Sequence, residues 1–567
     1  MRPASLFMVM ILSIAACANL GTTGKAVTYD FEVSSYDLSY EIDPEKRIFK
    51  STQDIGIINV SKNRVNHIYF LLHPDLLIDS IAVLDSKGKT IGVTGWELLE
   101  TQRIFLNTLR IVQVRTSKRI APGREYRFRL VYHARPGAFK DSLSQEDHIL
   151  ELTLCAESSY AIGPTTGHNA LFNRNTVAPF QFTVKYPQGN YCCVPGNLVS
   201  SEESAGQMVE TYQSKTPKIP TFSCAPYEKN VSRVGENTSE FYLYPGQPFV
   251  KEMASIVAKI VQLYTTSFGD PGTDTYRFAN VGVQGSGFPP GLESKGNAIY
   301  LTDFTTRYYT LDDFVKEMFI GFIAHELFHN WNLFTLNWTG MLMNWFEEGG
   351  ANFVGSWAVE QLFGEDRAIG GRVHFAESYD GGQGFRGYEA EGTLESVYKN
   401  DMASLMLMYY YGALVWEQLR QKVGDEAMFA GLADFFEKYA FKSVTYQDFL
   451  QCLQMKTDVQ VEAYLNQWIK HNARIDLVIG DVNVQELNET YTTEVEIVVD
   501  ADRDYELFTS IGYRTPAQDQ LSIIDVHTTE KGSHKVAFES NERPVFIQVD
   551  PACRVPQINL ENNIWQE

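Results

Sequence analysis

The stretch "HELFHNW", which begins at His325, and the glutamate Glu348 constrain the fold of this chain more than any other feature. Residues four apart on a helix lie on one face, so the imidazoles of His325 and His329 can converge on one cation if this stretch is helical. Glu348 follows His329 by 19 positions, a gap that a helix–turn–helix can span. Two imidazoles and one carboxylate leave a fourth position open, which is typical of a catalytic zinc site.

Glu326 and Asn352 complete the predicted site. Glu326 is rotated by about 100° from His325 around the helix axis, so it can lie beside a water at the site without being a ligand, as a general base does. Asn352 comes one helical turn after Glu348 and can orient a ligand from behind, although it can equally be a plain polar residue. Glu347 is the alternative third ligand. Two histidines on a helix that only packs are the alternative to a metal site.

The length of the chain predicts several domains, since 567 residues exceed what one hydrophobic core accommodates. Residues 27–241 are short, partly alternating runs of β-branched and aromatic residues, typical of an all-β domain. Residues 242–472 begin with an amphipathic helix and two strands and continue as an almost unbroken series of helices. Residues 473–567 return to strands and predict a C-terminal β-sandwich. We therefore expect a multidomain α+β chain.

The net charge limits the partners. With 48 Lys and Arg against 70 Asp and Glu, the chain carries a formal charge of −22. Nucleic acids and anionic membrane surfaces attract basic proteins, so neither is expected as an electrostatic partner.

Residues 1–17 are typical of an export signal, because an apolar run from Leu6 to Ala16 is too short to span a bilayer. The residues before Cys17 resemble a bacterial lipobox, in which the cysteine is acylated and anchors the protein. An ordinary signal-peptidase site near Ala16 and Ala18 is the alternative. We expect an exported protein of the bacterial cell envelope, periplasmic or lipid-anchored through Cys17, or a secreted one. A lipid at Cys17 is the only expected membrane contact.

The other cysteines show no metal-binding or redox spacing. In an oxidising compartment, the adjacent Cys192 and Cys193 can pair with Cys155 or Cys224. Scattered buried thiols are the alternative.

"HELFHNW" followed at this spacing by "WFEEGGANF" resembles the gluzincins, and within them the aminopeptidase N / leukotriene-A4-hydrolase family. "PPGLESKGNAIYL" resembles the family's G-x-M-E-N loop, whose glutamate binds the substrate's α-amine; the resemblance assigns that role to Glu293, with Gly291 beside it. Leu292 and Ser294 depart from the loop's Met and Asn, and "GLES" is close to the glycyl aminopeptidase version.

"YYYGALVWEQ" resembles the family's Y-x-K-G-A helix. Alignment on Gly412 and Ala413 places the catalytic tyrosine, which donates to the oxyanion, at Tyr409. The lysine of that motif is Tyr411 here, so Tyr410 and Tyr411 are alternatives.

The resemblance implies an N-terminal β-domain, a thermolysin-like α/β plus helical catalytic domain, and a C-terminal β-sandwich. It also implies a zinc-dependent aminopeptidase that holds one Zn²⁺ and acts on peptides with a free N-terminal amine. A zinc endopeptidase of the same fold and a non-catalytic peptide-binding lipoprotein are the alternatives.

Overall fold

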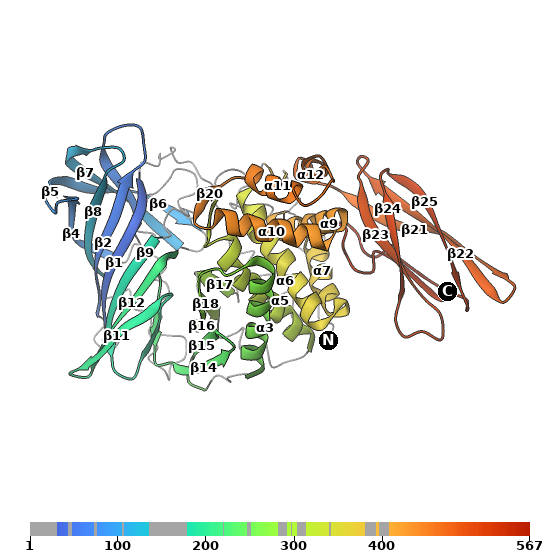
Figure 1. Ribbon diagram of the computed structural model, residues 1–567, viewed down its shortest axis with the longest axis horizontal. Helices are drawn as coiled ribbons and strands as arrows, with labels where there is room; N and C mark the ends of the chain where they lie inside the picture. The colour runs from blue at the N-terminus through green and yellow to red at the C-terminus, as the bar shows by residue number, and fades with distance from the viewer. Residues whose placement is uncertain are drawn as a thin grey trace. The chain divides into compact units, whose positions relative to one another are not determined.

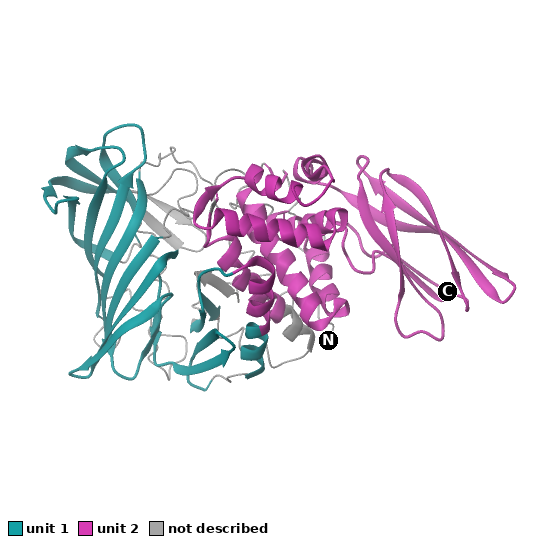
Figure 2. Cartoon of the chain, in the orientation of Figure 1, with its two compact units in different colours: residues 1–258, 270–311 teal, residues 259–269, 312–567 magenta. Residues whose placement is uncertain are grey.

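In the computed structural model the chain forms two compact units, residues 1–258 with 270–311 and residues 259–269 with 312–567 (Figure 2). The description below covers residues 31–43, 48–72, 76–104, 107–134, 178–218, 220–246, 251–281, 292–295, 297–302, 313–338, 342–379, 393–395 and 407–567. The predicted export signal and Cys17 lie outside these residues. The predicted domain boundaries after residues 241 and 472 stay predictions.

The first unit begins with two β-sheets (Figure 1). Within the described part, the larger sheet has the strand order β11-β12-β9-β1-β2-β8-β4-β5 and the smaller has the order β3-β7-β6. The rings of Phe70 in β3 and Phe128 in β8 lie 5.4 Å apart, so the two sheets share one apolar core. The strands are β1 (Phe31–Asp43), β2 (Ile48–Asn59), β3 (Val65–Leu72), β4 (Leu76–Asp85), β5 (Thr90–Ile91), β6 (Val93–Ile104), β7 (Asn107–Ile120), β8 (Glu125–Ala134), β9 (Ala178–Pro187), β11 (Asn197–Ser204) and β12 (Gln207–Lys218).

A further sheet of the first unit has the order β14-β15-β16-β18-β17. Helix α3 (Lys251–Phe268) connects the parallel strands β15 and β16 and ends at Gly269, whose φ of 84° suits glycine. Strand β17 forms the edge and pairs antiparallel with β18. The short strands β10 (Tyr191–Cys193) and β13 (Ser223–Ala225) pair just before this sheet. Its strands are β14 (Glu228–Val234), β15 (Asn237–Leu243), β16 (Thr275–Val281), β17 (Leu292–Lys295) and β18 (Ala298–Thr302).

The second unit is a helical layer followed by two β-sheets (Figure 1). Helix α5 carries apolar residues on every side, and residues 319–332 are buried or half-buried, as expected for a helix enclosed by others. Short strands β19 (Leu336–Trp338) and β20 (Lys442–Val444) pair between the helices. The helices are α5 (Asp313–Asn332), η3 (Trp345–Gly349), α6 (Gly350–Phe363), α7 (Glu365–Tyr379), η4 (Leu407–Tyr411), α9 (Gly412–Val423), α10 (Asp425–Tyr439), α11 (Tyr446–Gln454) and α12 (Val461–Ile469), where η denotes a π-helical turn.

The C-terminal sheets have the orders β21-β22-β25 and β24-β23-β26-β27. The predicted series of β-domain, mixed sheet, helices and C-terminal β-sheets is therefore confirmed, and the chain is a multidomain α+β protein. Within the part that the structure describes, the helices fall short of the length and apolar character that a bilayer crossing requires. The strands are β21 (Ile475–Leu487), β22 (Thr490–Ala501), β23 (Leu507–Arg514), β24 (Ser522–Thr528), β25 (Gly532–Ser540), β26 (Phe546–Val549) and β27 (Ile564–Gln566).

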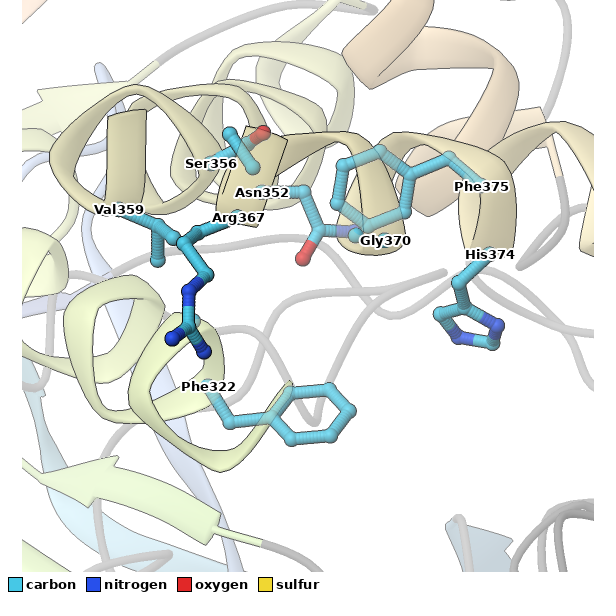
Figure 3. Close-up of a pocket in the computed structure, with 11 residues that line it drawn as sticks. Phe322, Asn352, Ser356, Val359, Arg367, Gly370, His374 and Phe375 are labelled. Carbon is cyan, nitrogen blue, oxygen red and sulfur yellow. The ribbon is translucent and has the colours of Figure 1, made fainter. Parts of the chain in front are cut away.

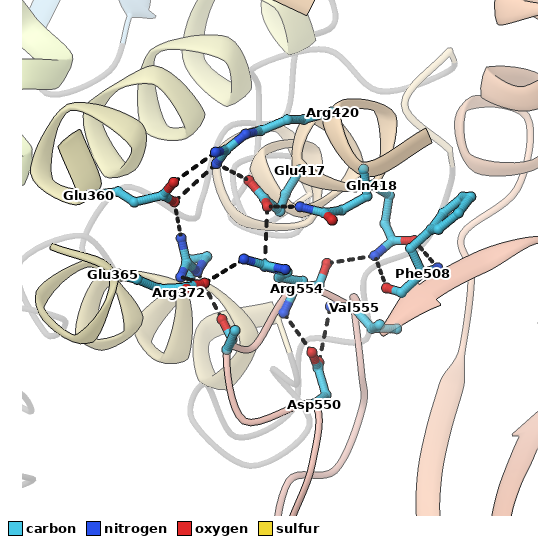
Figure 4. Close-up of polar contacts among 12 residues, drawn as sticks. Glu360, Glu365, Arg372, Glu417, Gln418, Arg420, Phe508, Asp550, Arg554 and Val555 are labelled. Carbon is cyan, nitrogen blue, oxygen red and sulfur yellow. Dashed lines mark hydrogen bonds and ion pairs between the residues drawn. The ribbon is translucent and has the colours of Figure 1, made fainter. Parts of the chain in front are cut away.

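Buried polar contacts join these sheets to the helical layer (Figure 4). The amide of Gln418 in α9 donates to the carbonyl oxygen of Phe508 at 2.8 Å and accepts from its N–H at 3.0 Å. Glu360 of α6 accepts from Arg372 of α7 at 3.0 Å and from Arg420 of α9 at 2.7 Å. Because Glu360 of α6 forms ion pairs with both arginines, it links helices α6, α7 and α9.

Candidate active site

Helix α5 brings His325, Glu326 and His329 together in the interior. Their exposed fractions are 5%, 8% and 5%, and their donor atoms all lie within 4.8 Å of one another. The hydroxyl of Tyr264 donates to the carbonyl oxygen of Ala324 at 3.0 Å, which fixes α5 just before the first histidine. The ring of Phe328 packs against the ring of the same tyrosine.

Three donor atoms lie close enough to share one ion. His325 Nε2 is 3.1 Å from His329 Nε2, and Glu348 Oε2 is 3.4 Å from the former and 3.7 Å from the latter. A tetrahedral zinc ion with bonds of about 2.0 Å holds its ligands about 3.3 Å apart. The donor set and its spacing therefore fit zinc. Glu326 Oε1 is 4.0 Å from His325 Nε2, so Glu326 flanks the three donors instead of joining them.

Glu348 lies in the π-helical turn η3, and glycines let this turn and α6 approach their neighbours. A Cβ atom at Gly349 would lie 2.7 Å from the carbonyl oxygen of Met408 in η4. One at Gly355 would lie 2.9 Å from the carbonyl oxygen of Gly321 and 3.2 Å from the N atom of His325. Contacts below 3.0 Å force the backbone to shift, so the "EEGGANFVG" stretch needs glycine to bring Glu348 to the histidines.

Two asparagines hold the outer nitrogens of the imidazoles. Asn352 Oδ1 lies 2.8 Å from His325 Nδ1, and its amide nitrogen donates to the carbonyl oxygen of Tyr409 at 2.8 Å. Asn332 Oδ1 lies 3.1 Å from His329 Nδ1, and its nitrogen donates to the carbonyl oxygens of Phe346 at 3.2 Å and Glu347 at 2.7 Å. Since both amide nitrogens are committed to carbonyls, both oxygens accept, and each Nδ1 carries the proton. Each Nε2 is left with a lone pair for a metal.

Of the three candidate tyrosines, Tyr409 is the one that contacts the cluster. Its ring stacks on that of His325, with centroids 6.1 Å apart, and Glu348 is close enough to contribute to the raised pKa of its hydroxyl. Tyr410 lies against His374, 5.1 Å between ring centroids. The hydroxyl of Tyr411 donates to the carbonyl oxygen of Trp468 at 2.9 Å, which gives it a structural role.

The charges around the cluster favour a cation. Burial lowers the pKa of His325, but the Glu348 carboxylate and the charge of Glu326 outweigh it, so the pKa is raised overall. Burial is the main cause that raises the pKa of Tyr409 well above its usual range, and the negative charge of Glu348 raises it further. The hydroxyl of Tyr409 therefore stays protonated. The Glu348 carboxylate lies 3.4 Å and 3.7 Å from the two imidazole nitrogens, and its assignment as third ligand in place of Glu347 stays a prediction.

Comparison with known proteins identifies the segment that holds this cluster. Residues 292–468 match the family model described as the Peptidase family M1 domain. Residues 292–468 are called the M1 domain below, after the family model that they match. The match begins at β17, ends in α12 and contains every residue of the cluster, and the resemblance found in the sequence is confirmed.

The M1 domain also relates the chain to curated aminopeptidases. The chain is 22% identical to "Aminopeptidase N" of Lactobacillus helveticus, over 41% of this chain and 28% of the relative. It is 29% identical to "Aminopeptidase M1-B" of Oryza sativa subsp. japonica over 26% of this chain and 17% of the relative. "Probable aminopeptidase 2" of Sulfurisphaera tokodaii is 21% identical over 77% of this chain and 54% of its own length. The chain thus spans about half or less of these relatives.

The remaining predicted residues belong to the first unit. Glu293 lies in the edge strand β17, opposite Tyr300 of β18. Gly291 lies outside the described residues. The roles of all predicted site residues stay predictions.

A pocket beside the histidine cluster was not predicted (Figure 3). Residues of α5, α6 and α7 line it, among them Phe322, Asn352, Val359 and His374, and it holds roughly 540 Å³ counting space open to solvent. Asn352 links it to the cluster, because the same side chain bonds His325. Sequence reasoning missed the pocket, since its wall combines side chains from three separate helices. It also missed Asn332, although "HNWN" contains that residue.

Proposed function

We propose that the M1 domain is a zinc-dependent aminopeptidase that removes N-terminal residues from peptides. The observation that carries the proposal is the convergence of His325 Nε2, His329 Nε2 and Glu348 Oε2 at mutual distances of 3.1, 3.4 and 3.7 Å. The match to a peptidase family and the names of the relatives support the class of reaction.

His325, His329 and Glu348 would hold the ion, which, when bound, supplies Lewis-acid polarisation of water and of the substrate carbonyl. Glu326 accepts the proton of the attacking water and passes it to the leaving nitrogen; its position beside His325 suits both transfers. Tyr409 donates its hydroxyl proton in a hydrogen bond to the developing oxyanion, and it can do so over a wide pH range because its pKa is raised.

Two further groups would select the substrate. Glu293 binds the substrate's α-ammonium, as the resemblance of "PPGLES" implies, and a carboxylate there favours a cationic amine. We assign one substrate side chain to the pocket beside Asn352. Its mostly apolar wall favours an apolar side chain.

The test uses aminoacyl fluorogenic amides, each with a free or an acetylated amine, with the zinc-loaded protein and with a chelated sample. Cleavage of the free-amine substrates alone, lost on chelation, would support the proposal. Cleavage of both forms would identify a zinc endopeptidase and remove the role of Glu293. Zinc-dependent peptide binding without cleavage would identify a non-catalytic peptide-binding protein.

We also propose that the protein is exported, because residues 1–17 read as a signal and Cys17 follows a lipobox-like sequence. Expression in a bacterial host followed by fractionation tests this. A lipid-modified N-terminal cysteine in the membrane fraction, absent from Cys17→Ser, is expected. A cleaved, unmodified protein in the periplasm or medium would instead indicate ordinary secretion.

A further inference from the structure

Two cysteines face each other across the short β10–β13 pair. Cys192 is directly opposite Cys224 in the antiparallel register, and each side chain is 2% exposed. Cys224 is close enough to contribute to the raised pKa of Cys192. Directly opposed residues of antiparallel strands have Cβ atoms about 4.5–5.5 Å apart and Cα atoms about 4.5–5.5 Å apart. Disulfides bridge Cα atoms about 4.4–6.8 Å apart, so a bond here needs only small adjustments.

The adjacent Cys193 is not an equal candidate. Successive strand residues point to opposite faces. Cys192 and Cys224 pack in the core of the N-terminal sheets, whereas Cys193 packs with Tyr242 and Tyr300 in the core of the next sheet. In the register, Cys193 stands opposite Ser223. The strand pairing therefore selects one partner for Cys224.

We propose that Cys192 and Cys224 form a structural disulfide when the chain folds in an oxidising compartment. The bond forms between the two Sγ atoms. The two thiols give up two protons and two electrons to a disulfide oxidant, glutathione disulfide or a protein disulfide, which is reduced to two thiols. The closed loop contains 31 residues, including the β11–β12 hairpin.

The bond should form before the strands are fully buried. Thiol–disulfide exchange requires a thiolate. Burial is the main cause that raises the pKa of Cys192 well above its usual range, and the neighbouring Cys224 raises it further. The folded protein therefore holds little thiolate at Cys192. The low exposure of both sulfur atoms would then protect the finished bond from reductants. Such behaviour distinguishes a structural disulfide from a regulatory one, which is exposed and easily reduced.

The position gives the bond a structural consequence. The β13 segment joins two cores, because Phe222 packs with the N-terminal sheets and Ala225 with the following sheet. Just before it, Thr221 Oγ1 lies 3.4 Å from the hydroxyl of Tyr300, the residue opposite Glu293. A cross-link at Cys224 would thus fix the segment that supports the edge strand of the sheet.

The experiment refolds the full chain from denaturant in a glutathione redox buffer, and in parallel with a strong reductant. Free thiols are then alkylated in denaturant, and the linked peptides are mapped by mass spectrometry. Cys192 and Cys193 fall in one peptide, so the linked peptide of the wild type cannot show which of them is bonded. The variants Cys192→Ala, Cys193→Ala and Cys224→Ala are therefore refolded and mapped by the same procedure. We expect the link to Cys224 in wild type and in Cys193→Ala, and its loss in Cys192→Ala.

Alkylated Cys224 in the oxidised wild type, a link that survives in Cys192→Ala, or a link to Cys155 would each overturn the proposal. Melting temperature gives a second readout, because a loop of this size stabilises the fold measurably. We expect oxidised wild type to melt on the order of 5 °C above reduced wild type, with no such difference in Cys224→Ala. Equal melting temperatures in wild type would contradict a structural role. Neither readout depends on zinc or on peptidase activity.

Discussion

Replacing Asn332 by alanine tests whether the imidazoles are held by the asparagines. The change removes the acceptor 3.1 Å from His329 Nδ1 and both bonds from the amide nitrogen to the carbonyl oxygens of Phe346 and Glu347. The first loss frees the ring to rotate or to change tautomer. The others loosen the connection between α5 and the turn that carries Glu348.

The expected magnitude follows from burial. His329 is 5% exposed, so water cannot readily replace the lost acceptor, and a buried donor without a partner costs about 1–3 kcal/mol. Such a cost corresponds to a factor of roughly 5 to 150 in an equilibrium constant, and partners of metal-bound histidines typically contribute about 10–100-fold to metal affinity. We therefore expect the Kd for zinc to rise about 10–100-fold in Asn332→Ala.

Competition with a chromogenic chelator at fixed pH measures this Kd. The matched control is Asn330→Ala on the same helix, because Asn330 is also buried, at 4% exposed, but its amide donates to the carbonyl oxygen of Leu327 at 3.0 Å. Its zinc affinity should stay within a few-fold of wild type. If Asn332→Ala binds zinc as tightly as wild type, or if the control weakens binding equally, the positioning argument is wrong.

Three further predictions follow from the same region. Glu326→Gln should lower kcat by about 10²–10⁴-fold while zinc content, measured by metal analysis, stays at the wild-type level; loss of zinc would contradict the assignment. Gly371→Leu should fill the pocket, because a Cβ atom at Gly371 meets no atom within 4 Å. It should lower kcat/KM for large apolar substrates about tenfold relative to Gly371→Ala. Equal kinetics of the two variants would exclude the pocket from substrate binding. Burial lowers the pKa of His374 to about 4 from 6.5, so the unfolded chain binds a proton that the folded one does not, and stability should fall by up to about 3 kcal/mol as pH drops from 6.5 to 4. Urea unfolding at several pH values should show a weaker fall for His374→Gln.

Local periodicity accounts for what the sequence predicted well. The four-residue spacing of His325 and His329 places them on one face of any helix. Asn352 was predicted in the same way, because it follows Glu348 by one helical turn. Tyr409 was ambiguous because three tyrosines are adjacent and the motif's lysine is missing. In the structure Tyr409 stacks on His325, whereas the hydroxyl of Tyr411 donates to the backbone of α12. Which tyrosine is catalytic stays a prediction.

Features built from distant segments were beyond sequence reasoning. Asn332 donates to two carbonyl oxygens of the turn before α6, and the sequence around Asn332 does not show this contact. The bonds of Glu360 to Arg372 and Arg420 likewise join three helices. No local pattern marks either, since buried asparagines and ion pairs look like surface residues in a sequence.

Two carboxylates and two imidazoles meet in the interior at this site. Glu326 and Glu348 are buried beside two imidazoles, and carboxylates away from water are costly unless a cation or hydrogen bonds compensate them. Proton uptake by His325 would offset part of this charge, as its raised pKa shows, but the asparagines already occupy the outer nitrogens and leave the inner ones facing Glu348. A divalent cation among the three donors would satisfy both inner nitrogens and both negative charges at once. The hydrogen bonds that orient the imidazoles would thus also favour a divalent cation at this position.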